Sequence, residues 1–85
     1  MKLPVIRSLA EFIAEHDESD VESAIKVLEH VSQARGLKEE ELDTIGELLS
    51  NMYGSIDVAK AVKEGAEQKV ALNDFMKRVM GSIDR

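Results

Sequence analysis

An apolar seam along one long helical segment is the feature that most constrains this chain. Across residues 38–64, apolar side chains recur at alternating spacings of three and four, which is typical of a helix that packs one stripe against another helix. Acidic residues in the first turn, lysines in the last turn and Gly65 directly afterwards suit the two ends of a single helix. The seam consists of Leu42, Ile45, Leu49, Met52, Ile56 and Ala59.

This predicted helix is long for so small a chain. A helix over residues 38–64 would be about 40 Å long at a rise of about 1.5 Å per residue. A compact domain of 85 residues has a radius of gyration of about 12 Å, and hence a diameter of about 30 Å. The helix is therefore expected to overhang, to bend, or to be covered by another chain.

Gly54 and Ser55 bear on this choice. Because a helix turns by about 100° per residue, Gly54 lies on the side of the helix away from the seam. A glycine within a helix costs about 1 kcal/mol of stability relative to alanine. The pair marks either a kink or a second face where another helix comes close. We favour an unbroken or gently kinked helix over a true break at this point.

Three shorter helices are predicted, over residues 3–16, 20–35 and 67–80. Ser19 and Glu22 match a capping box near the start of the second helix. Gly36 and Gly81 are placed to end the second and the fourth. The sequence therefore predicts an all-α single domain over residues 1–85, a small four-helix bundle or pair of helical hairpins with one long third helix.

The charge of the chain is acidic and unevenly placed. The net charge is −6, with 13 acidic and 5 basic side chains in residues 1–57, against 4 acidic and 6 basic ones in residues 58–85. An acidic surplus disfavours nucleic acid and anionic membranes, and we expect neither as a partner. The asymmetry reflects either solvated helix faces or the acidic part of one copy meeting the basic part of another.

No residue pattern in the chain indicates catalysis or a cofactor. Cysteine is absent, and His16 and His30 lack the spacing that places two metal ligands on one helical face. No serine stands in a nucleophile elbow, and no glycine-rich phosphate loop is present. We therefore expect no enzyme, no cofactor and no metal site. The alternative is a small enzyme or ligand-binding protein whose fold assembles a site around His16 or His30.

Charged residues within the first predicted helix bear on the cellular compartment. Arg7 and Glu11 break any apolar run that a signal peptide or a membrane span would need. The absence of cysteine fits a reducing compartment. We expect a cytoplasmic protein without membrane contact.

A homodimer is the assembly that the sequence favours. A chain of this size buries a thin core, and the seam, with Leu48 and Tyr53 beside it, is wider than one neighbouring helix usually covers. We expect a non-enzymatic interaction or accessory protein that pairs through its long helix. Replacing the peripheral Tyr53 would separate an interface from a core, because only a core residue is needed for folding. The candidate interface residues are Leu42, Ile45, Leu49, Met52, Tyr53 and Ile56.

Three segments carry a resemblance to a known family. MKLPVIRSLAEFI at residues 1–13, ELDTIGELLSNMYG at residues 41–54 and DFMKRVMG at residues 74–81 are similar to a family of small, all-helical bacterial proteins of unknown function. The resemblance covers nearly the whole chain and implies no activity and no functional residues. It also implies relatives encoded near thiol-redox genes, such as those for peroxiredoxin and thioredoxin. In that setting a chain without cysteine would be an accessory, not a thiol catalyst.

Overall fold

Residues 2–83 fold into four α-helices. The computed structural model describes the backbone of residues 2–83 and the side chains of residues 2–79, and it contains no strand in that range. This confirms the predicted all-α class and the long third helix. The helices are α1 (Leu3–Glu15), α2 (Glu18–Val31), α3 (Glu39–Lys63) and α4 (Gln68–Ile83).

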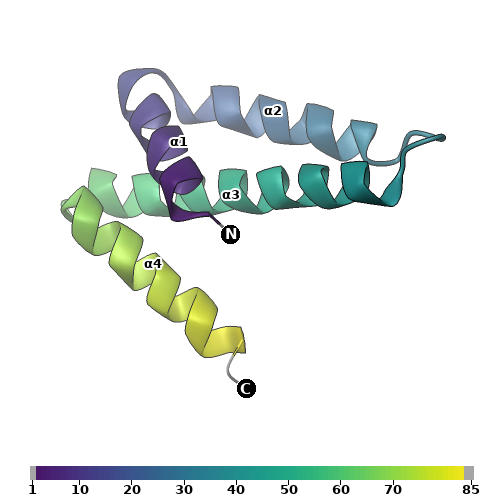
Figure 1. The fold of residues 1–85 in the computed structure, drawn as a ribbon. Coiled ribbons are helices and arrows are strands. Elements are labelled where there is room, and N and C mark those ends of the chain that lie inside the picture. Colours follow the sequence, from purple (N-terminus) through teal and green to yellow (C-terminus); the bar gives the residue numbers. More distant parts are fainter. Residues whose placement is uncertain (1, 84–85) are drawn as a thin grey trace.

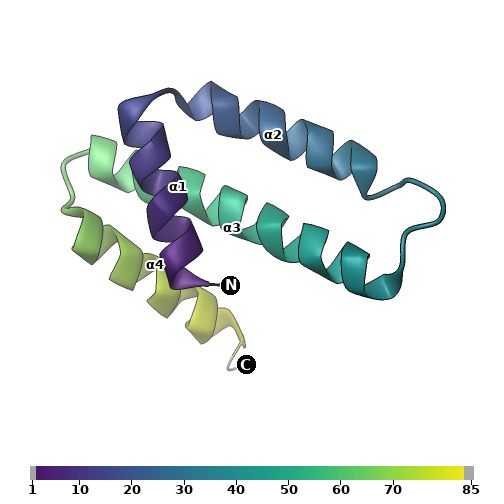
Figure 2. The ribbon, with the colours of Figure 1, turned by 45° about the horizontal axis from the view of Figure 1, so that its top comes forward.

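The helices form a flat slab whose principal extents are 44 × 35 × 17 Å. α2 and α4 flank α3 on opposite sides, and α1 crosses α3 on one face of the slab, where it also contacts α2 (Figure 1 and Figure 2). We call the face that carries α1 the front face and the opposite one the back face. Because packed helices lie about 8–10 Å apart, the slab is two helices thick only where α1 lies.

The core lies where α1, α3 and α4 meet. Small residues on α3 make this contact possible: a Cβ built on Gly54 would lie 2.8 Å from Cζ of Phe75, so α4 approaches α3 through the space that a side chain would fill. The sequence pattern pointed to the apolar seam as the packing face, but the buried face of α3 is Asn51, Gly54, Ser55 and Val58. The core cluster consists of Ile6, Ala10, Val58, Ala71, Leu72 and Phe75.

α3 is one continuous helix through Gly54 and Ser55, as favoured from the sequence. Its first turn is closed by Lys38, whose backbone N–H donates to Oε1 of Glu41 at 2.8 Å. Gly65 follows its last turn with a φ of 113°, a left-handed conformation that ends the helix as predicted. Gly54 therefore marks the close approach of another helix and does not interrupt α3.

The ends of the other helices differ from the predictions by a few residues. Asp17, not Ser19, caps α2: its carboxylate accepts from the backbone N–H of Ser19 at 3.4 Å and from the Ser19 hydroxyl at 3.0 Å. α2 ends at Val31, so Gly36, with a φ of 87°, shapes the following loop and does not stop the helix. α4 runs through Gly81, which was predicted to end it.

The far ends of α2 and α3 project beyond the rest of the molecule as a two-helix hairpin (Figure 1). We call residues 26–50 the distal hairpin, and none of its side chains is buried. The radius of gyration is 13.7 Å, against about 12 Å for a compact chain of this length. The expected overhang of the long helix is therefore present, and α2 alone accompanies it.

Candidate interaction surfaces

The back face of α3 carries a stripe with no helix of the described chain over it. Asn51 marks the front of α3, because its Oδ1 accepts from the backbone N–H of Lys2 at 3.1 Å, at the start of α1. At about 100° per residue, several side chains lie within about 40° of the direction opposite Asn51. We call them the back stripe, and they are Leu42, Gly46, Leu49, Tyr53, Ile56 and Lys60.

The back stripe is apolar except for Lys60, and it is partly open. Leu42 is 40% exposed and Tyr53 is 52% exposed, and Leu49 and Ile56 are half-buried. Gly46 is exposed, and a Cβ built there would meet no atom within 4 Å. The stripe is therefore a shallow surface with a notch at Gly46, into which a side chain from another molecule would fit.

The structure divides the predicted interface between two directions. Leu42, Leu49, Tyr53 and Ile56 belong to the back stripe. Ile45 and Met52 are half-buried. They lie on the side of α3 that faces α2, opposite Gly54. The division arises because α2 covers one edge of the seam, whereas α1 and α4 pack against other sides of the helix.

Tyr53 joins α2 to α3 at the edge of the back face. Its hydroxyl donates to Oε2 of Glu29 on α2 at 2.6 Å. Since this hydrogen bond favours the neutral phenol, and the Glu29 carboxylate repels a phenolate, the pKa of Tyr53 is raised above its ordinary value of 10.0. Tyr53 is thus half exposed and lies outside the core cluster, which agrees with its predicted peripheral place.

A groove separates α3 from α4 on the back face. It has a volume of about 380 Å³ and runs past Tyr53, Ile56, Phe75 and Val79. An exposed ion pair joins the two helices: Nη2 of Arg78 on α4 lies 3.1 Å from Oδ2 of Asp57 on α3. The groove continues the back stripe toward α4 and widens the apolar surface on this face.

A second apolar surface lies on the front face, beside α1. Four large apolar side chains are exposed there: Phe12 is 40% exposed, Val27 61%, Val31 37% and Leu48 37%. On α2, Val27 and Val31 lie within about 20° of the direction opposite Glu29, whose side chain marks the back edge. On α3, Leu48 lies about 60° from Asn51, toward α2. We call these four residues, from three helices, the front corner.

The two histidines are not brought together. His30 lies exposed in the last turn of α2, and the ring of His16 packs against Phe12 with 4.5 Å between the ring centroids. Within residues 2–79, no group of three or more side chains is placed to hold a metal ion. Within that range neither histidine therefore belongs to a group that could hold a metal ion.

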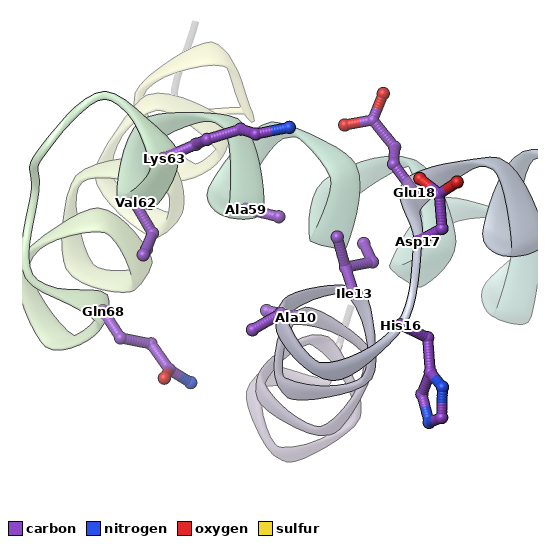
Figure 3. Close-up of a pocket in the computed structure, with 10 residues that line it drawn as sticks. Ala10, Ile13, His16, Asp17, Glu18, Ala59, Val62, Lys63 and Gln68 are labelled. Atoms are coloured by element: carbon purple, nitrogen blue, oxygen red, sulfur yellow. The ribbon is translucent and has the colours of Figure 1, made fainter.

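His16 does reach the rim of an open cleft at the ends of α1 and α3. The cleft has a volume of about 330 Å³ and an apolar floor that includes Ala10, Ile13 and Val62. Figure 3 shows the imidazole of His16 turned away from this floor, with Lys63 on the opposite rim. The pKa of Asp17, also on the rim, is lowered chiefly by its hydrogen bonds from Ser19. The rim is thus polar, but no polar side chain is buried in the cleft.

Comparison with known proteins places the chain in a family. The model of a family of unknown function (DUF6952) matches residues 1–84. The chain belongs to this family. No curated protein and no solved structure matches it.

The family assignment confirms the resemblance to a family of unknown function and adds no activity to it. The bacterial origin and the thiol-redox gene context stay predictions. Surfaces, not a relative's active site, are therefore the basis for a functional argument. Among the described residues, no helix is long and apolar enough to cross a membrane.

Proposed function

We propose that this member of the family is a non-enzymatic interaction protein that pairs with a second copy of itself through the back stripe of α3. The observation that carries the proposal is the open back face, where an apolar stripe runs along the longest helix with no helix of the described chain over it. Apolar stripes on helices are stable when another helix covers them. A second copy of the chain can supply such a helix, because its own α3 carries the same apolar stripe.

The exposed area of the chain supports this pairing. A compact monomer of 9.4 kDa exposes about 5,000 Å². This chain exposes 6185 Å², which is about 1,200 Å² more. A standard protein interface covers about 800 Å² on each partner. The surplus is therefore large enough for one interface of ordinary size.

The charges on α3 favour an antiparallel pair. Acidic residues fill its first turn, and Lys60 and Lys63 lie in its last turn. In a parallel pair, Lys60 of one copy would face Lys60 of the other. In an antiparallel pair, Lys60 lies beside Leu42 and Glu39 of the second copy. Its methylene groups then cover the leucine, and its ammonium group is drawn to the acidic turn.

The antiparallel register also matches large side chains with small ones. With the crossing point between Leu49 and Tyr53, Leu49 of one copy packs against Tyr53 of the other. Ile56 of one copy then lies over the notch at Gly46 of the other. Large side chains that face small ones interdigitate in this way at well-packed helix contacts.

Light scattering behind a sizing column tests the pairing. The expected mass at micromolar concentration is twice the 9.4 kDa of the chain. A Tyr53→Lys variant should remain helical by circular dichroism and elute as a monomer, because the tyrosine is half exposed and its loss leaves the core intact. Val70→Lys is the control that adds the same charge: Val70 is 47% exposed and belongs to α4, not to the back stripe of α3, and the variant should stay dimeric. A wild-type mass near 9.4 kDa overturns the proposal.

Disulfide cross-linking tests the orientation. Because the chain has no cysteine, each introduced thiol is the only one in its molecule. A mixture of Leu42→Cys and Lys60→Cys chains should form a cross-linked heterodimer under mild oxidation, and Leu42→Cys alone should not. Efficient cross-linking of Leu42→Cys with itself would instead show a parallel pair.

A further inference from the structure

The front corner, on the face opposite the back stripe, is apolar and open. Phe12 of α1, Val27 and Val31 of α2, and Leu48 of α3 are all at least 37% exposed. α1 crosses only the half of α3 that lies toward its C-terminus, so the distal hairpin has no helix in front of it within the described chain (Figure 2). Isolated apolar side chains are ordinary on a surface, but here four from three helices share one face, and a concentration of exposed apolar side chains is typical of interaction sites.

The shape of the corner fits one helix. α2 and α3 run side by side and provide a floor, and α1 stands on that floor as a wall (Figure 1 and Figure 2). On α1, Arg7 and Glu11 line a hollow toward α4, so Phe12, about 140° from Arg7, lies on the side toward α2. A helix laid beside α1 would contact Phe12 on the wall, and Val27 and Leu48 on the floor.

The charges around the corner are acidic. On α3, Glu40, Glu41 and Glu47 lie on the same side as Asn51, within about 80° of it, and therefore surround the floor. On α2, Asp20 lies directly opposite Glu29, and hence on the front edge. Among the described residues of α2 and α3, no lysine or arginine lies within about 80° of these front directions. On α1 the bases are Lys2, at its start, and Arg7, which lines the hollow toward α4.

We propose that the front corner binds an amphipathic helix of a partner protein, one whose apolar stripe is flanked by lysine or arginine. The apolar stripe of such a helix covers Val27, Val31 and Leu48, and its basic flanks meet the acidic rim. A second copy of this chain does not fit that description. The basic side chains of α4 accompany an apolar face that is already buried against α3, at Leu72 and Phe75. The inference is independent of pairing through the back stripe.

Two synthetic helical peptides test the inference on the full chain. Both have leucine along one face, and the other face is lysine in one peptide and glutamate in the other. The lysine peptide should bind in a fluorescence anisotropy titration, at least tenfold more tightly than the glutamate peptide, and more weakly as salt is raised. Backbone amide NMR signals of residues 20–31 and 40–48 should shift on binding, and those of Tyr53 and Ile56 should not.

Variants locate the site of binding. Val27→Lys, at a position 61% exposed, should stay folded and lose at least tenfold in affinity for the lysine peptide. Val70→Lys adds the same charge on α4 and should bind like the wild type. Tyr53→Lys should also bind the peptide, which separates this inference from the fate of the dimer. Equal loss with Val27→Lys and Val70→Lys, or a preference for the glutamate peptide, overturns the inference.

Discussion

Two glycines in α3 can be compared directly, because replacing either one with alanine changes the helix propensity by the same amount. Gly46 and Gly54 lie in the interior of the same helix, and replacing either with alanine gains about 1 kcal/mol of helix propensity. At Gly46 the new methyl group meets nothing within 4 Å, so that gain should appear in full. At Gly54 the methyl group would lie 2.8 Å and 3.0 Å from two ring atoms of Phe75, and 3.5 Å from Cδ1 of Ile6.

Phe75 is 7% exposed and its ring must shift to admit the methyl group, so Gly54→Ala should carry an overpacking cost of about 1–3 kcal/mol. We expect Gly46→Ala to raise the free energy of unfolding by about 1 kcal/mol, and Gly54→Ala to leave it unchanged or lower it by up to about 2 kcal/mol. For a chain of this size, 1 kcal/mol corresponds to about 4–8 °C in Tm.

Urea denaturation followed by circular dichroism measures both variants. Dissociation of the proposed dimer would make the apparent stability depend on concentration, so both variants are compared in the Tyr53→Lys background, which is expected to be monomeric. If Gly54→Ala stabilises the protein as much as Gly46→Ala does, the close approach of α4 to α3 is wrong.

Three further outcomes follow from single contacts. Asn51→Ala should lower the free energy of unfolding by about 1–3 kcal/mol in urea denaturation, because the N–H of Lys2 loses its acceptor. Ultraviolet absorbance should show the only tyrosine, Tyr53, ionising above pH 10.0, and Glu29→Gln should move that titration back down. Hydrogen bonds from Ser19 lower the pKa of Asp17 in the folded protein below its ordinary value of 3.8. The ionised Asp17 carboxylate therefore stabilises the fold above pH 3.8, and this stabilisation is lost as the pH falls through the lower, folded-state pKa. Asp17→Asn should therefore lower the Tm at neutral pH, with a deficit that shrinks in acid below pH 3.8.

The sequence predicted the helices well, because their signals are local. Both ends of α3 were placed within one residue, from an acidic first turn and from Gly65. The start of α2 was misplaced, because Asp17 and Ser19 are both good caps and their spacing alone does not rank them. Asp17 prevails in the structure since Ser19 donates two hydrogen bonds to it.

The packing face of α3 was not predictable from its apolar pattern. Asn51 is buried because it meets the backbone of Lys2, 49 residues away in the sequence, and no local signal reports such a contact. Gly54 did carry a signal, since a glycine opposite an apolar stripe indicated either a kink or a close approach. The front corner was missed altogether, because it is assembled from single residues of three helices.

The distal hairpin gives this small protein two levels of stability. A segment without buried side chains opens more readily than the cluster around Val58 and Phe75, so its amide hydrogens should exchange with solvent first. Any molecule that covers the hairpin, on either face, would then stiffen it and slow that exchange. Binding would therefore be detected as slower hydrogen exchange in the distal hairpin, with unchanged exchange in the rest of the fold.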